Sequence, residues 1–196
     1  MGDPHGVSKI YSPEESPIPG FLFDDPVVRE ELALYYTPVR RADDALGAIL
    51  NALDASGEKE NTIFVFLSDH GMPLPFAKTQ LYHHSTQTPL IIRWPGVTQP
   101  ETVDDRHMVS AIDFLPTFCD MVHAPHPDGL QGTSFEPLLQ GKAQQGRTAV
   151  FKEYNENAGG NRHPMRGVET PEYLYLFNPW SDGQDVMRTA TQGTKT

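Results

Sequence analysis

Residues 61–71 are Asn-Thr-Ile-Phe-Val-Phe-Leu-Ser-Asp-His-Gly, and this stretch decides the fold. The five apolar residues from Ile63 to Leu67 predict a strand that is buried on both faces, as in a parallel sheet. In open α/β folds, ligands bind just beyond the carboxyl ends of such strands, where loops present polar groups. Asp69 and His70 stand at that position, and Gly71 permits a sharp exit, which is typical of a metal-binding turn. The alternative is a helix N-cap at Asp69 beside a surface histidine.

The sequence that follows this strand adds a more specific pattern. A loop contains Pro75-Phe76-Ala77-Lys78 and then Leu81-Tyr82, and residues 88–96, Thr-Pro-Leu-Ile-Ile-Arg-Trp-Pro-Gly, predict a second apolar strand closed by Pro-Gly. Taken together, these motifs resemble the sulfatase family of the alkaline-phosphatase-like superfamily. Within that family the resemblance is closest to sulfatases of the heparan N-sulfatase (sulfamidase) kind. Ser-Asp-His-Gly alone would be a weak signal, whereas the combination is specific.

A second match lies about 90 residues further along. His163-Pro164-Met165-Arg166 is followed by a predicted antiparallel pair formed by residues 164–168 and 173–177. A similar segment and hairpin occur in sulfamidases, which is why this subfamily is favoured. The resemblance implies an α/β fold. Residues 1–145 would be the later part of an alkaline-phosphatase-like mixed sheet flanked by helices, and residues 146–196 would begin a small antiparallel C-terminal subdomain.

The resemblance also implies roles for individual side chains. Lys78 and His5 would be catalytic: Lys78 would contact the sulfate group, where a cation stabilises the negative charge that builds as the bond to sulfur breaks. His5 belongs to Asp3-Pro4-His5, which matches the end of a His-Asp-Pro-His segment, so the chain is expected to begin inside that motif. The alternative for His5 is a solvated histidine near a frayed terminus.

Four further residues are candidates for substrate binding, each with a plainer alternative. His83 and His84 stand where other sulfatases often have small residues, and they face either the substrate or only solvent. His163 and Arg166 would bind the anionic sugar, or Arg166 would instead be a hairpin arginine paired on the surface.

The metal and the nucleophile are expected from the family. Asp69 and His70 would hold a divalent metal, for which Ca²⁺ is the family expectation. An imidazole ligand suits Mn²⁺ or Zn²⁺ better than Ca²⁺ or Mg²⁺, so the metal's identity stays open. Sulfatases make formylglycine from a Cys or Ser followed by x-Pro-x-Arg, and no such motif occurs in the 196 residues. Formylglycine and two further carboxylate ligands are therefore expected in an N-terminal part that this chain lacks.

Two decoys resemble the missing motif without fitting it. Residues 36–40, Tyr-Thr-Pro-Val-Arg, have the Pro and Arg spacing, but tyrosine cannot yield the aldehyde. Cys119 is followed by Asp-Met-Val-His, which fails the pattern. Cys119 is most simply a core residue of a helix that begins near Asp113 and presents Phe114, Leu115, Phe118 and Met121 as its apolar face.

The composition limits the possible partners. The formal net charge of −11 argues against a nucleic-acid partner, because phosphates require a basic surface. A single cysteine excludes an internal disulfide, and no apolar run of 18 residues predicts a membrane-spanning helix. A sulfated saccharide or another small sulfated molecule is the expected substrate. The oligomeric state and the cellular compartment are left open.

A long helix is predicted before the first strand. Asp25-Pro26 is a good start, because Asp caps a helix and Pro suits its first position. Pro38 predicts a break or kink near Thr37. Beyond it, apolar residues at helical spacing predict a face that packs on the sheet, and Ser56-Gly57 predicts the end.

The sequence leaves two other functions open. Phosphoester and phosphonate hydrolases of the same superfamily also use an Asp-His turn, and they differ from sulfatases in using an unmodified Thr or Ser as nucleophile. A non-catalytic binding module is the third interpretation, because the nucleophile and two metal ligands are missing from this chain.

Overall fold

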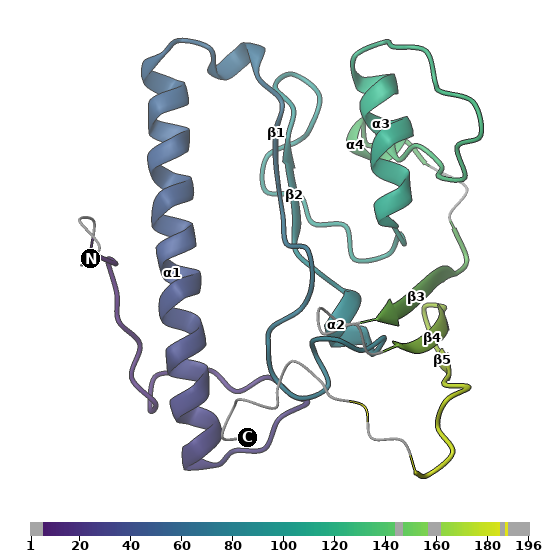
Figure 1. The fold of residues 1–196 in the computed structure, drawn as a ribbon. Coiled ribbons are helices and arrows are strands. Elements are labelled where there is room, and N and C mark those ends of the chain that lie inside the picture. The colour runs from purple at the N-terminus through teal and green to yellow at the C-terminus, as the bar shows by residue number, and fades with distance from the viewer. Residues whose placement is uncertain (1–5, 144–146, 157–161, 185–186, 188–196) are drawn as a thin grey trace. The chain divides into compact units, whose positions relative to one another are not determined.

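The computed structural model describes residues 6–143, 147–156, 162–184 and 187, which form two compact units. The first unit contains the described part of Met1–Thr62 together with Leu67–Pro89. The second contains Ile63–Phe66 and the described part of Leu90–Asp185. Figure 1 shows the helices and strands in chain order.

A single long helix dominates the first unit. Helix α1 spans Pro26–Ala55, and Asp25 caps it by accepting a hydrogen bond from the backbone nitrogen of Val27 at 2.8 Å. At the other end Ser56 is the C-cap, and Gly57 has a φ of +77°, a conformation that glycine adopts without strain. The predicted start and end of the helix are confirmed. A short 3₁₀ helix, η1, follows at Lys59–Asn61.

Of the break or kink predicted near Thr37, the break is wrong, because α1 continues through Pro38 as one element (Figure 1). A proline inside a helix removes one backbone donor and crowds the preceding turn. Here the hydroxyl of Thr37 donates to the carbonyl oxygen of Ala33 at 2.9 Å and accepts from the backbone nitrogen of Tyr11 at 3.1 Å. The side chain next to the proline thus adds bonds where the backbone loses one.

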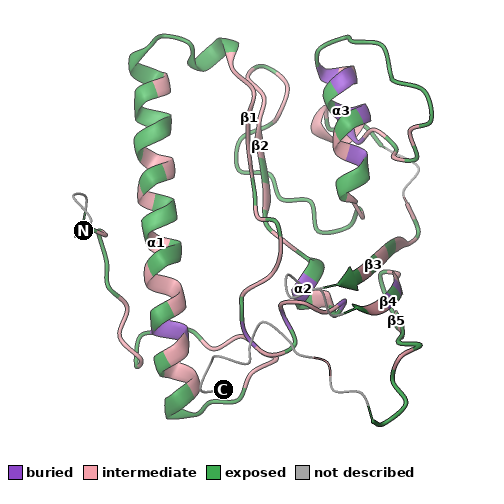
Figure 2. Ribbon diagram, viewed as in Figure 1, coloured by how far each residue is buried: buried purple, intermediate pink, exposed green. Residues whose placement is uncertain are grey.

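The apolar face predicted for the second half of α1 is not buried. The buried residues of this helix are Leu32 and Ala33, near its start, and most of the helix is exposed or partly exposed (Figure 2). Val39 is 44% exposed and Ile49 is 59% exposed. Helical periodicity therefore marked an apolar face whose side chains stay exposed or only partly buried.

Strand β1 spans Phe64–Leu67, as predicted, and pairs with β2, Leu90–Arg93, in a two-stranded sheet. Burial on both faces is not observed: Leu67 is 47% exposed and Ile91 is 55% exposed. A central strand is covered by further strands and by helices on both faces. No third strand joins this sheet among the described residues, so the apolar side chains stay partly accessible.

Helix α3 spans Phe114–Met121 and follows directly on the 3₁₀ helix η2, Ala111–Asp113. Asp113 is the N-cap residue of α3, as the predicted start near Asp113 requires, and its side chain forms a capping box with Ser110 at the start of η2. Cys119 is buried, as predicted. Part of the predicted apolar face lies outward instead, since Leu115 is 50% exposed.

Asp113 is the centre of a buried polar network in the second unit. Its side chain is 3% exposed and accepts hydrogen bonds from the backbone nitrogens of Ser110 and Thr133, each at 2.8 Å, and it also pairs with Arg147. Thr117 extends the network: its hydroxyl donates to the carbonyl of Asp113 and accepts from the nitrogen of Phe135 at 3.0 Å. The network fixes the segment before α4, Glu136–Leu139, against α3.

Three antiparallel strands follow: β3, Val150–Glu156, β4, Arg162–Glu169, and β5, Leu174–Phe177, in the order β3-β4-β5. The predicted pairing of the last two is confirmed. In this register Phe151 lies opposite Val168, which lies opposite Tyr175. Residues directly opposite share a face of a sheet. Phe151 is 78% exposed and Tyr175 is 64% exposed, so this face of the sheet is aromatic and open.

Within the described residues, no helix combines the length and the apolar character that crossing a membrane requires.

Candidate functional site

The Asp-His turn directly follows β1, as the sequence predicts. The hydroxyl of Ser68 donates to the carbonyl oxygen of His70 at 2.9 Å and thereby closes the turn. The Asp69 side chain is 84% exposed, and that of His70 is 40% exposed. The two side chains therefore stand at a strand end and are accessible to a ligand.

The hydrogen bonds of His70 define which of its ring nitrogens can bind a metal. Its Nδ1 lies 2.7 Å from the carbonyl oxygen of Gly71. A carbonyl oxygen only accepts, so Nδ1 carries the proton and Nε2 carries the lone pair in the neutral ring. That Nε2 lies 3.5 Å from Oδ2 of Asp69. Two acceptors facing each other are stabilised by a proton or by a cation between them.

This donor pair fits a divalent metal. Metal–ligand bonds to His nitrogen and carboxylate oxygen are about 2.0–2.2 Å long, so two donors 3.5 Å apart can both reach one ion. The pair is also only part of a complete coordination sphere. Among the described residues, no group of three or more His, Cys, Asp or Glu side chains is arranged to hold a metal.

Gly71 joins the Asp-His turn to two other segments. Its nitrogen donates to the carbonyl oxygen of Ser85 at 2.9 Å. A Cβ at position 71 would overlap the carbonyl oxygen of His84, and it would lie 3.1 Å from the carbonyl oxygen of Ala77. Glycine is thus required by the close approach of two other stretches of backbone. One of them is the short helix α2, His83–Thr86, and the other carries Lys78.

Lys78 lies in a loop that is anchored by buried side chains. Leu74, Ala77 and Leu81 are 2%, 0% and 3% exposed. Phe76 and Thr79, on either side of Ala77-Lys78, have φ angles of +64° and +59°. Positive φ is unfavourable for residues with a Cβ, and such strain gathers at functional sites where the surroundings enforce it. The loop therefore holds Lys78 in a fixed backbone conformation.

Aromatic rings pack around this loop and α2. The ring of His84 stacks on Phe21, with centroids 4.1 Å apart and planes 20° apart, and meets His83 edge-on at 5.3 Å. Phe76 and Tyr82 form a second edge-on pair at 5.7 Å. Phe21 is the residue that sequence reasoning missed. It is 63 positions from His84, and no local pattern links the two.

The structure brings together five of the predicted site residues in the first unit: Asp69, His70, Lys78, His83 and His84. His5 lies outside the described residues. The other two candidates, His163 and Arg166, belong to strand β4 of the second unit.

The surroundings of Arg166 and His163 are specific. Arg166 donates to the carbonyl oxygen of Met165 at 2.8 Å and pairs with Glu153 at 3.7 Å. This is the paired hairpin arginine that the sequence left open as an alternative. His163 meets the ring of Trp180 edge-on, with centroids 4.9 Å apart.

Comparison with known proteins shows the family to which the chain belongs. The model of the family described as sulfatase matches residues 4–124. The chain belongs to the sulfatase family. The model described as N-sulphoglucosamine sulphohydrolase, C-terminal, matches residues 69–185, which agrees with the resemblance seen in the sequence.

Two curated relatives illustrate the relationship. Human N-sulphoglucosamine sulphohydrolase is 29% identical over 184 residues, which cover 89% of this chain and 36% of that protein. An ulvan-active sulfatase of Formosa agariphila is 35% identical over 161 residues, covering 82% of this chain and 26% of the relative. The chain thus spans roughly a third of the length of the curated relatives it matches.

Solved structures share the fold. A protein in complex with its substrate D-glucosamine-2-N,6-O-disulfate matches with a TM-score of 0.58 and 26% identity, over 78% of this chain and 34% of that one. A phosphonate monoester hydrolase of Agrobacterium radiobacter matches with a TM-score of 0.64 and 26% identity, over 74% of this chain and 32% of that one. The fold is that of part of an alkaline-phosphatase-like α/β domain, as predicted.

Proposed function

We propose that this chain forms part of a metal-dependent sulfatase that removes sulfate from a sulfated sugar by hydrolysing a sulfate ester or a sulfamate. The observation that carries the proposal is the junction at Gly71, where the Asp69-His70 turn, the Lys78 loop and α2 meet backbone to backbone. The two candidate metal ligands, the lysine proposed for the sulfate and two histidines would then belong to segments that meet at one junction. Relatives whose names include sulfated-sugar substrates support this substrate class.

Asp69 and His70 would hold the metal through Oδ2 and Nε2. Sulfatases are in general dependent on a divalent metal, which when bound polarises sulfate oxygens and stabilises a deprotonated nucleophile. The hydrogen bond from Nδ1 of His70 to Gly71 keeps the ring in the tautomer that leaves Nε2 able to ligate. The nitrogen ligand favours Mn²⁺ or Zn²⁺, and the oxygen ligand suits Ca²⁺, the family expectation, or Mg²⁺.

Lys78 would bind the sulfate oxygens, with His5 as a second group on the same anion. The backbone of the Lys78 loop is fixed by its buried neighbours and by the two positive φ angles beside it. A fixed backbone limits the positions that the lysine side chain can reach, which supports a role in stabilising the negative charge that builds as the bond to sulfur breaks. His5 is proposed from its motif alone.

The sugar itself would be bound by histidines and an arginine. His83 and His84 lie on α2, next to the Gly71 junction, which supports contact with the saccharide. For His163 and Arg166 the support is the family motif that contains them. The ion pair from Arg166 to Glu153 means that its charge is shared with a carboxylate before any sugar binds.

The test is equilibrium binding, because the chain lacks a formylglycine motif. D-glucosamine-2-N,6-O-disulfate is titrated calorimetrically into the chain in the presence of Mn²⁺ or Ca²⁺. A hydrogen bond between charged groups contributes about 1.5–3 kcal/mol, so Lys78→Ala should weaken binding by about tenfold or more. Lys142→Ala removes an exposed lysine and serves as the matched control. Equal affinity in the unchanged chain and in Lys78→Ala would contradict the assigned role.

A phosphonate or phosphate ester hydrolase is the second candidate, and the imidazole at His70 is the observation that favours it. The same titration with a phosphonate monoester separates the two. Tighter binding of the phosphonate than of the disulfate, with the same loss in Lys78→Ala, would favour this alternative. If the chain is a non-catalytic module, the binding affinity for neither anion should depend on Lys78.

A further inference from the structure

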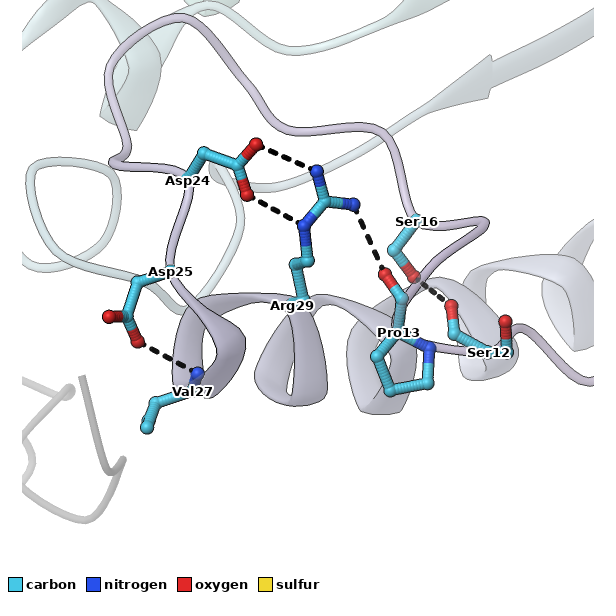
Figure 3. Close-up of polar contacts among 7 residues, drawn as sticks. All are labelled: Ser12, Pro13, Ser16, Asp24, Asp25, Val27 and Arg29. Carbon is cyan, nitrogen blue, oxygen red and sulfur yellow. Dashed lines mark hydrogen bonds and ion pairs between the residues drawn. The ribbon is translucent and has the colours of Figure 1, made fainter.

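The segment before α1 forms a loop whose two ends are held by one side chain. The guanidinium of Arg29 binds the Asp24 carboxylate through Nε at 2.6 Å and Nη2 at 2.8 Å, while Nη1 donates to the carbonyl oxygen of Pro13 at 3.4 Å (Figure 3). Ser16, which is buried, donates to the carbonyl oxygen of Ser12 at 2.8 Å. We call residues 13–24 the Arg29 loop. The two ends of the loop cannot separate without breaking these hydrogen bonds from Arg29.

The middle of the Arg29 loop is also fixed. The hydroxyl of Tyr36, on α1, donates to the carbonyl oxygen of Pro17 at 2.9 Å. Leu22 donates its backbone hydrogen to the carbonyl of Pro19 at 3.0 Å, which closes a turn that contains Gly20 and Phe21. Phe21 therefore lies on a turn of a loop that Arg29 and Tyr36 of α1 hold at Pro13, Pro17 and Asp24.

Phe21 reaches the candidate site through His84. The 4.1 Å stack fixes the plane of the His84 imidazole, and His83 contacts its edge. The backbone of His84 in turn lies against Gly71, next to the metal-binding turn. Stacked rings resist the rotation of either ring about its side-chain bonds, because rotation removes the contact.

We propose that Phe21 is a positioning residue for His84, and that the Arg29 loop holds Phe21 in place. Phe21 would hold the His84 ring in the orientation that contacts the sulfated sugar, without contacting the sugar itself. The proposal rests on the proposed function, in which His84 binds substrate. The chain also offers a comparison: Phe23 lies on the same loop, two residues on, and is 83% exposed.

The experiment is a double-mutant cycle on the full chain with D-glucosamine-2-N,6-O-disulfate as the probe. Phe21→Leu keeps most of the apolar volume and removes the aromatic face. It should weaken binding by about threefold to tenfold, the range that one aromatic pair provides. The same change in a His84→Ala background should have no effect, because Phe21 acts only through His84. Phe21→Tyr should restore binding, and Phe23→Leu should leave it unchanged.

An independent readout checks the geometry. A ring that stacks on Phe21 experiences its ring current, so the NMR signals of the His84 ring protons should move in Phe21→Leu and return in Phe21→Tyr. The proposal is overturned if Phe21→Leu binds as tightly as the unchanged chain. It is also overturned if Phe21→Leu weakens binding equally with and without His84.

The outcomes also separate this inference from the proposed function. If Lys78→Ala weakens binding and Phe21→Leu does not, the proposed function survives and the role of Phe21 is lost. If the unchanged chain does not bind the disulfate, both are overturned. The NMR signals would then show only that the rings pack together.

Discussion

Gly71 lies so close to His84 that a Cβ at position 71 would overlap the carbonyl oxygen of His84 and lie 2.9 Å from its carbonyl carbon. Both atoms belong to backbone, which cannot rotate away as a flexible side chain can. The Asp69-His70 turn and α2 can therefore meet only because this position has no side chain.

Gly71→Ala should destabilise the fold by about 1–3 kcal/mol, the usual cost of overpacking, and should weaken metal binding as well. Chemical denaturation and metal titration measure the two effects. Gly47→Ala is the matched control, because a Cβ there meets nothing within 4 Å inside α1. That change should stabilise the chain by about 0.5–1 kcal/mol. Similar stability of Gly71→Ala and the unchanged chain would mean that the backbone around position 71 can move apart to accept a Cβ without a measurable loss of stability.

His70→Ala should lower the affinity for Mn²⁺ and Zn²⁺ by about tenfold or more, because it removes one of the two donors 3.5 Å apart. The loss for Ca²⁺ should be smaller, since calcium prefers oxygen ligands. Isothermal titration of each metal measures the effect. His107→Ala removes a histidine that pairs with Asp104 and is the control. An equal loss for all three metals would argue against direct ligation by the imidazole.

Asp113→Asn should destabilise the second unit by about 3 kcal/mol, because it leaves Arg147 without its buried carboxylate and places an amide group among backbone donors. Urea denaturation followed by circular dichroism measures the change. Asp128→Asn alters an exposed carboxylate and should change stability by less than about 0.5 kcal/mol. Equal midpoints for the two variants would show that the network adds little.

The Arg29 loop should open in acid. The hydrogen bonds from Arg29 hold the pKa of Asp24 below its ordinary value. A carboxyl with a lowered pKa contributes its stabilisation fully above its ordinary pKa of about 3.9, and the contribution is lost as the pH falls through the lowered value. The NMR signal of the Arg29 side-chain Nε–H should therefore titrate below about pH 4. In Asp24→Asn it should be insensitive to pH over the same range, and a titration that persists there would assign the effect to another group.

Local pattern predicted much of this chain, including the strand that precedes Asp69-His70, the cap at Asp25 and the last antiparallel pair. These features depend on neighbouring residues, so the sequence contains them directly. The sulfatase assignment followed from several motifs in a fixed order, and the family comparison confirms it.

Other features depend on parts of the chain that are far apart. The stack of Phe21 on His84 and the approach of Gly71 to α2 connect residues whose separation no periodicity encodes. The prediction of a helical break at Pro38 was wrong for a similar reason. The hydroxyl of Thr37 accepts a hydrogen bond from the backbone nitrogen of Tyr11, which lies in the segment before α1. Apolar spacing predicted faces but could not predict what covers them, and Ile49 and Ile91 remain more than half exposed.

The open aromatic face of the β3-β4-β5 sheet has a consequence for the behaviour of the chain in solution. Phe151 and Tyr175 on that face would favour self-association, while the net charge of −11 keeps copies apart. Salt screens the repulsion over about 10 Å at 0.1 M and leaves the apolar attraction in place. The chain should therefore be more soluble in dilute buffer than in concentrated sulfate, and light scattering should rise with ionic strength.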